Sequence, residues 1–413
     1  MNKTRSLLAL AILAAPGVSL AAGFALNEQS IKSLGTALAG RASTASDATT
    51  VYGNPAGMAL LEGTQISGNV TMINAPADIT PTGGFPNTGT NNGDMVPLTF
   101  VGSNFATHRF SDSFTAGFGL YAPFGLATNY EDSFQGRYFG DKSKVKVIAI
   151  QPTGSYQISP DLSVGLGVAF SKIEGTLSRA VSPLAPGAMS MVKGDDTAVN
   201  FNAGVLWSLD EATRLGLTYH SQTDYTLSGT TTVTNLPTVI PGGNGSYPGS
   251  LEISMPDSFD LSLTHKMSQD TTVHATAMLT RWGVIKELVI HNSGAPAALA
   301  TVIEELEWHD SWLYSVGAEW KMSDTLVLRG GIGHDETPIN GAYRSVRVPS
   351  ADRDFLTLGV GYALSKNLSM DIAYELIRED KAIVNVSNSS GLSYSAEYSG
   401  VAHLFGAQLN LNF

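Results

Sequence analysis

The chain has 413 residues, a formal net charge of −12 at pH 7 and only 15% charged residues, with 43 glycines and no cysteine. The acidic balance argues against a nucleic-acid partner, because phosphates are bound by Lys and Arg side chains. The lack of cysteine excludes a small exported scaffold held together by disulfides.

The N-terminus carries the features of an export signal. Two basic residues among the first five precede an apolar run over residues 7–15, which is too short to cross a bilayer as a mature helix. The small residues Ser19 and Ala21 occupy the −3 and −1 positions of a cleavage site. The sequence therefore predicts a secretory signal peptide over residues 1–21. The alternative is an N-terminal membrane anchor.

Downstream of this segment the dominant hydrophobic pattern has a period of two. In the last segment, residues 401–413, one face is apolar and the other polar: Val401, Phe405, Ala407, Leu409, Leu411 and Phe413 against Gly406, Gln408, Asn410 and Asn412. Side chains alternate along a strand, so this pattern predicts a strand with one apolar face. That face points inward in a soluble sandwich and outward to lipid in a membrane barrel.

Fourteen segments carry strand signals. They are residues 64–75, 98–110, 114–122, 145–158, 162–173, 197–209, 214–229, 257–266, 271–282, 311–321, 326–334, 355–364, 368–378 and 401–413. An even number of strands near the ~9–11 residues that a tilted transmembrane strand needs is typical of outer-membrane barrels.

The connections between these segments alternate in length. Short turns lie at residues 111–113, 159–161, 210–211, 268–270, 323–324 and 365–367, and long loops lie at about 76–97, 123–144, 174–196, 230–256, 283–310, 335–354 and 379–400. Short periplasmic turns opposite long outer loops are the layout of an outer-membrane barrel. A closed barrel is also the only sheet that spans lipid without an unpaired edge. We therefore predict an all-β protein, a 14-stranded antiparallel transmembrane β-barrel over residues 63–413.

The segment over residues 22–62 has no period-two pattern. Ile31, Leu34 and Leu38 lie at helical spacing, and a turn cluster follows at residues 53–57. The segment is either a periplasmic extension or a plug inside the lumen, and its small, weakly charged residues favour an N-terminal helical hatch. A plugged lumen argues against a general water-filled porin.

Several ordered segments of the mature chain match the motifs of a known protein family. They are Ala22-Gly23-Phe24-Ala25-Leu26-Asn27-Glu28, Asn54-Pro55-Ala56, Phe124-Gly125-Leu126-Ala127-Thr128, Leu328-Arg329-Gly330-Gly331-Ile332 with Asp335, Pro338, Arg344 to Pro349 and Asp352-Arg353, and His403-Leu404-Phe405-Gly406 to Phe413. In these segments the chain resembles the FadL family of outer-membrane long-chain fatty acid transporters. The resemblance implies a hatch in a fourteen-stranded barrel, an outer low-affinity groove and a deeper pocket. It also implies passive diffusion, a sideways opening at a kink in the third strand, and a monomer.

The resemblance places the ligand head group at Arg179, just past the fifth strand. A fatty acid needs an apolar slot for its tail and a cation for its carboxylate, because an unpaired buried carboxylate is costly. The alternative interpretation of Arg179 is a solvated loop residue. The family also uses a Lys before the tenth strand, where this chain has Glu304. An acid there repels a carboxylate, which favours a neutral ligand such as toluene.

Other residues take predicted roles from the same resemblance. Phe24 lines the pocket, or is simply a core residue of the hatch. The motif Asn54-Pro55-Ala56 holds the hatch fold, since Asn bonds its own backbone in turns and Pro fixes φ. Pro123 and Gly125 lie at the kink of the third strand, because Pro cannot donate to a sheet ladder and Gly weakens it. Alternatively, the strand merely ends at Pro123.

These features predict an outer-membrane channel for hydrophobic small molecules, most of all long-chain fatty acids, in a Gram-negative envelope. The alternatives are a channel for neutral aromatic hydrocarbons and a structural or adhesive barrel whose loops bind partners or phage. No catalytic set, metal-ligand spacing or cofactor motif emerges from the sequence, so we expect no enzyme activity, metal or cofactor. Outer-membrane lipid and lipopolysaccharide are the expected surroundings.

Overall fold

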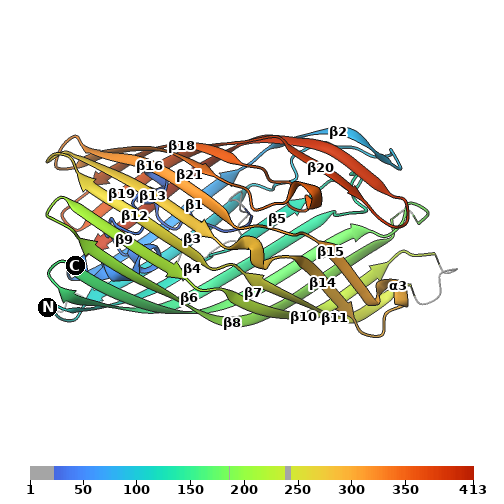
Figure 1. The fold of residues 1–413 in the computed structure, drawn as a ribbon, viewed down its shortest axis with the longest axis horizontal. Helices are drawn as coiled ribbons and strands as arrows, with labels where there is room; N and C mark the ends of the chain where they lie inside the picture. Colours follow the sequence, from blue (N-terminus) through green and yellow to red (C-terminus); the bar gives the residue numbers. More distant parts are fainter. Residues whose placement is uncertain (1–22, 186, 238–242) are drawn as a thin grey trace, which may run out of the picture.

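The computed structural model describes residues 23–185, 187–237 and 243–413, so the predicted signal peptide lies outside the described residues. The described chain forms a closed antiparallel β-barrel of fourteen strands around an N-terminal segment, which confirms the predicted fold class (Figure 1). Among the described residues, none of the helices is long and apolar enough to span a membrane.

Several barrel strands are interrupted and consist of two strand segments. The segments are β1 (Thr64–Asn74), β2 (Ala77–Phe85), β3 (Thr99–Arg109), β4 (Phe114–Tyr121), β5 (Gly125–Asn129), β6 (Lys142–Ser159), β7 (Leu162–Ala180), β8 (Met189–Ser208), β9 (Thr213–His220), β10 (Thr223–Thr234), β11 (Gly245–Met255), β12 (Ser258–Lys266), β13 (Thr271–Thr280), β14 (Glu287–Asn292), β15 (Thr301–Glu305), β16 (Ser311–Lys321), β17 (Leu326–Asp335), β18 (Arg353–Ala363), β19 (Leu368–Glu379), β20 (Ala382–Ser387) and β21 (Ser393–Asn412). Short helical turns are α3 (Ala297–Ala300), η2 (Trp282–Val284) and η3 (Gly341–Tyr343).

The barrel closes where its first strand pairs with its last. β1 lies antiparallel to β21, with Gln65 opposite Asn412, and β21 also pairs with β19. The two faces differ as the alternation predicts: Phe405 on the outer face is 48% exposed, whereas Gln408 on the inner face is 1% exposed. An apolar outer face and a polar lumen are the arrangement of a barrel in lipid rather than of a soluble sandwich.

The strands extend further toward the long-loop end than predicted. Much of the sequence expected as loops pairs as strands, including β2, β11, β14, β20 and the first part of β21 (Figure 1). β2 and β11 are rich in Ser, Thr and Gly, and β14 and β20 are only six residues long, so hydrophobic periodicity gives a weak strand signal there. Backbone hydrogen bonds hold them in the ladder whatever the side chains are, so hydrophobic periodicity underestimates their length.

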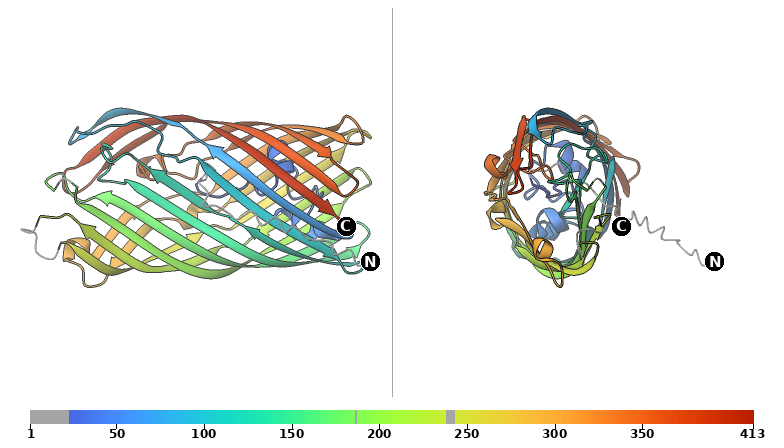
Figure 2. Two further views of the ribbon diagram at one scale, coloured as in Figure 1. Left: turned by 180° about the vertical axis from the view of Figure 1, so that it is seen from behind. Right: turned by 90° about the vertical axis from the view of Figure 1, so that its right-hand side faces the viewer.

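The N-terminal segment lies inside the ring of strands, as the view along the barrel shows (Figure 2). It contains α1 (Ile31–Gly35), α2 (Thr50–Gly53) and η1 (Pro55–Leu60). The Ser30 side chain caps α1 by accepting from the Ser33 backbone N–H. The helix ends before Leu38, whose φ of 62° is left-handed. The segment is therefore a plug rather than a periplasmic extension, and we propose residues 22–62 as a separate hatch domain.

Inward-facing glycines in the barrel wall admit the hatch. A Cβ built at Gly204 would overlap the Asn54 amide oxygen, and one built at Gly165 would overlap the backbone of Pro55. A side chain at either position would push the hatch away from β7 and β8. These two glycines therefore allow the hatch to pack closely against the barrel wall.

Candidate ligand-binding site in the lumen

The third barrel strand is broken, and the N-terminal segment lies at the break. Among the described strands, the edge of β3 that faces away from β1 pairs only with β4, from Asn104 to Arg109. β5, the second segment of the broken strand, pairs only with β6. The Leu26 N–H donates to the Pro123 carbonyl at 2.9 Å, and the Gly125 N–H donates to the Phe24 carbonyl at 2.9 Å. The predicted kink residues thus lie where the sheet ladder is interrupted.

An inner cavity lies on the long-loop side of the hatch and is lined mainly by aliphatic and aromatic side chains. Phe24 forms part of its wall and is 5% exposed. The Phe24 ring lies 4.9 Å from the ring of Trp282 and 5.8 Å from that of Trp308, centroid to centroid. A Cβ built at Gly23 would lie 2.6 Å from the Trp282 ring, so the chain start is packed against the cavity wall.

A larger outer cavity lies toward the long loops. Six residues border both cavities, namely Leu177, Val192, Leu288, Glu304, Ser345 and Arg347, so the two spaces adjoin. Arg179, the predicted head-group residue, lines the outer cavity only. Its side chain is half-buried near the end of β7, and it has no hydrogen-bond or ion-pair partner within the described ranges.

An ion pair lies between the two cavities. The Arg347 Nε donates to a Glu304 carboxylate oxygen at 3.0 Å, and the two side chains are 8% and 26% exposed. The Arg347 guanidinium also donates to the carbonyls of Lys142 and Ser178 and to the Ser143 hydroxyl, at 3.1–3.3 Å. The guanidinium is therefore fixed to the barrel wall, and Glu304 neutralises it.

Sequence reasoning recognised Glu304 as an anomaly and missed its partner. Arg347 belongs to the segment 344–349 that carried part of the family resemblance, but nothing local marks it as a lumen residue. It reaches the lumen because the connection between β17 and β18 turns inward, which is a tertiary feature. Within the described residues there is no cluster of three or more His, Asp or Glu side chains that could hold a metal ion.

The hatch motif forms a compact hydrogen-bonded turn. The Asn54 amide donates to the carbonyls of Ala42 at 2.7 Å and Val205 at 3.0 Å, and its oxygen accepts from the Ala56 N–H at 3.0 Å. Pro55 begins η1, where its missing N–H costs nothing. The Ala56 carbonyl accepts from two barrel hydroxyls, of Ser155 and Ser163. The motif therefore connects the hatch to itself and to the wall.

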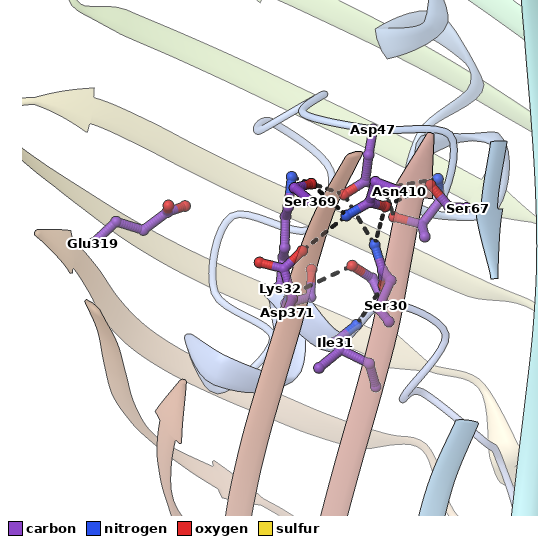
Figure 3. Close-up of polar contacts among 12 residues, drawn as sticks. Ser30, Ile31, Lys32, Asp47, Ser67, Glu319, Ser369, Asp371 and Asn410 are labelled. Atoms are coloured by element: carbon purple, nitrogen blue, oxygen red, sulfur yellow. Dashed lines mark hydrogen bonds and ion pairs between the residues drawn. The ribbon is translucent and has the colours of Figure 1, made fainter. Parts of the chain in front are cut away.

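A second polar network joins the hatch to the strands where the barrel closes (Figure 3). Lys32 and Asp47 of the hatch form an ion pair at 3.2 Å. Gln408 of β21 accepts from the Ile31 N–H and donates to Asp47. Asn410 extends the network to the hydroxyls and carboxylate of Ser67, Ser369 and Asp371. These side chains are largely buried, so charged and neutral hydrogen bonds together hold the part of the hatch around Ile31, Lys32 and Asp47 against the barrel wall.

A closed barrel with an apolar outer face, a polar wall and a plugged lumen defines an outer-membrane channel protein. The chain belongs to the outer membrane protein transport protein family OMPP1/FadL/TodX, whose profile matches residues 12–413. This confirms the resemblance noted in the sequence. The family consists of outer-membrane transporters of hydrophobic compounds and not of enzymes, and its members lie in the outer membrane of Gram-negative bacteria.

Individual relatives cover the whole chain. Outer membrane protein P1 of Haemophilus influenzae is 30% identical over 99% of both chains, and a long-chain fatty acid transport protein of Escherichia coli O6:H1 is 26% identical over 99% of this chain and 98% of that one. Among solved structures, a Pseudomonas aeruginosa FadL homologue superposes with a TM-score of 0.84 at 22% identity, covering 95% of this chain and 100% of that one. The Ralstonia pickettii toluene transporter TbuX gives 0.64 at 19% identity, covering 90% and 95%.

Proposed function

We propose that this chain takes up long-chain fatty acids by passive diffusion, binding the carboxylate at Arg179 and the tail in the inner cavity. The observation that carries the proposal is the Arg179 guanidinium, which lines the outer cavity and lacks a polar partner among the described residues. The outer cavity adjoins an apolar inner one through Leu177, Val192 and Leu288. A ligand with one anionic end and a long apolar end matches this arrangement.

Burial of the tail supplies the driving force for binding. Each methylene group transferred from water to an apolar wall contributes about 0.8 kcal/mol. The carboxylate opposes this transfer unless it is paired, and a guanidinium offers two parallel hydrogen bonds to it. Arg179 thus selects the head group while the inner cavity provides most of the affinity.

We propose that the ligand leaves sideways, at the break between β4 and β5. This is supported by the two backbone hydrogen bonds that join residues 24–26 to residues 123–125 at the break. Phe24 also borders the inner cavity, so a shift of the chain start would connect that cavity with the surrounding lipid. The rest of the hatch, which is fixed through Asn54 and Asp47, would stay in place.

The test is displacement of a fluorescent long-chain fatty acid from the mature barrel in lipid nanodiscs. Arg179→Ala is compared with wild type and with Arg378→Ala, which changes an exposed arginine on β19 that lines neither cavity. We expect Arg179→Ala to weaken fatty acid binding by about tenfold or more, because a charged hydrogen-bonded pair contributes ~1.5–3 kcal/mol. The control should bind as wild type does.

Equal binding by Arg179→Ala and wild type would refute the head-group role. Failure of every variant and of wild type to bind a fatty acid or toluene would point instead to a barrel whose outer loops are the functional part.

A second candidate ligand is a neutral aromatic hydrocarbon. The observation that favours it is the ion pair between Glu304 and Arg347 at the junction of the two cavities. Because Arg347 is already paired, it is not available to a ligand carboxylate. An aromatic ring needs only the apolar inner cavity and its rings at Phe24, Trp282 and Trp308. Toluene that displaces the fluorescent probe equally from wild type and Arg179→Ala would favour this candidate.

A further inference from the structure

We propose that the outer face of β6, β7 and β8 is a binding site for the phosphates of lipid A, the membrane anchor of lipopolysaccharide. The inference needs only the barrel's place in the outer membrane and is independent of the ligand in the lumen. It rests on a row of lysines, a groove beneath them and the height of both on the barrel.

The lysines share one face of three neighbouring strands. Val145 and Val147 of β6 point into the lumen and pack there, so the alternating residues Lys144 and Lys146 lie on the outer face. Lys172 of β7 and Lys193 of β8 are exposed on the same face. Register places Lys144 opposite Thr176 and Thr176 opposite Lys193, so these two lysines are two strand spacings apart.

This cluster is basic in a chain that is acidic overall. Two acids lie among the lysines, Glu174 and Asp195, and both contact the Lys172 ammonium, at 3.1 and 3.5 Å. Lys144, Lys146 and Lys193 have no ion-pair partner among the described residues. Three ammonium groups are therefore available to anions.

An apolar groove adjoins the lysines on the side of the short turns. It is lined at one end by Lys146, Lys172 and Glu174, of which Glu174 is paired with Lys172, and at the other end mainly by apolar side chains, namely Ile148, Ile150, Phe170 and Val199. Ile150, Phe170 and Val199 are 44–61% exposed. A molecule that fills this groove has an acyl chain and an anionic head.

The height of the cluster identifies the leaflet. Apolar outer residues continue along β6 from Ile148 to Ile158, at the short-turn end. Ten residues of a strand tilted by about 40° span about 25 Å, which equals the apolar band of an outer-membrane barrel. The lysines lie just beyond this band on the long-loop side, the level of the outer-leaflet head groups. The anionic lipid of that leaflet is lipopolysaccharide. Its lipid A phosphates lie on the head group, at the level where the acyl chains are attached.

The experiment measures lipid binding to the purified mature barrel in detergent by native mass spectrometry. The probe is lipid A with both phosphates, compared with the same lipid after removal of the phosphates and with phosphatidylglycerol. The variant Lys144→Gln/Lys146→Gln/Lys193→Gln leaves Lys172 with its two acids, so it creates no unpaired carboxylate. A matched control, Lys266→Gln/Lys321→Gln/Lys366→Gln, makes the same charge change at the short-turn end.

We expect the outer triple variant to bind lipid A about tenfold or more weakly, since each lysine near a membrane surface adds to anion attraction. The control should bind within about twofold of wild type, and wild type should lose affinity for the dephosphorylated lipid. Replacement of the same three lysines by arginine should retain binding, which separates lost charge from a folding defect. Equal losses in both triple variants, unchanged binding in the outer variant, or equal affinity for phosphorylated and dephosphorylated lipid would overturn the proposal.

Discussion

Glu304 offers a sharp test of how the lumen discriminates ligands by charge. Its carboxylate neutralises Arg347 at the junction of the cavities, and the change Glu304→Gln removes the negative charge while keeping a side chain of the same size. Arg347 stays in place, because it also donates hydrogen bonds to two carbonyls and the Ser143 hydroxyl. A second uncompensated cation, in addition to Arg179, then faces the route from the outer to the inner cavity.

The magnitude follows from Coulomb's law. A ligand carboxylate about 8 Å from Glu304 is repelled by about 2 kcal/mol at an effective dielectric constant of 20. Part of this is screened, because the Glu304 side chain is 26% exposed. We therefore expect fatty acid affinity to rise by about tenfold in Glu304→Gln, while the affinity for toluene stays within about twofold of wild type.

The assay is competition binding of both ligands to the two proteins in nanodiscs. Glu287→Gln is the matched control, because it makes the same change on the neighbouring strand β14, at an exposed side chain that lines neither cavity. An equal change in affinity for fatty acid and toluene, or an equal effect of Glu304→Gln and Glu287→Gln, would refute the electrostatic reasoning.

Three further predictions concern the hatch and the chain start. Asn54→Ala removes three hydrogen bonds, two of them buried, so hydrogen exchange should show the hatch opening more easily by about 2–3 kcal/mol while the barrel strands stay protected; unchanged exchange would contradict this. Burial alone would raise the pKa of the Asp47 carboxyl, but the Lys32 charge and hydrogen bonds from Thr49 hold that pKa below its usual value. Its stabilisation of the hatch is therefore complete at neutral pH and lost only as the pH falls below about 4, so the free energy of hatch opening, obtained from hydrogen-exchange protection factors, should be constant from about pH 8 to 5 and fall below about pH 4, and Asp47→Asn should abolish this fall. Phe24→Ala leaves a void beside Trp282, so tryptophan fluorescence should shift to the red and fatty acid binding should weaken by ~1 kcal/mol or more; an unchanged spectrum would place Phe24 outside the cavity wall.

The barrel could be predicted because its signals are local and repeated. Alternation in segments such as residues 401–413 and the short turns recur along the chain, and lipid requires a closed sheet. The halves of the strands nearest the long loops were not predicted, because Thr- and Ser-rich segments such as β10 and β11 pair through the backbone without an apolar face. Their length is a property of the hairpin, not of any one residue.

The site was predictable only in part, for a different physical reason. Family resemblance located Arg179 and Phe24 at cavity walls, and the composition of the chain start favoured a plug. The Glu304 anomaly is resolved by Arg347, which lies 43 residues further along the chain. Such a pairing depends on how two long connections fold into one lumen, and neither spacing nor periodicity encodes it.

The most direct test of the central claim is a crystal structure of the barrel with a fatty acid brominated at the end of its tail. The anomalous signal of bromine locates the tail independently of the protein. We expect a bromine peak in the inner cavity beside Phe24 and Trp282, with the carboxylate at Arg179. A bromine peak among the outer loops, or a ligand in the reverse orientation, would contradict it.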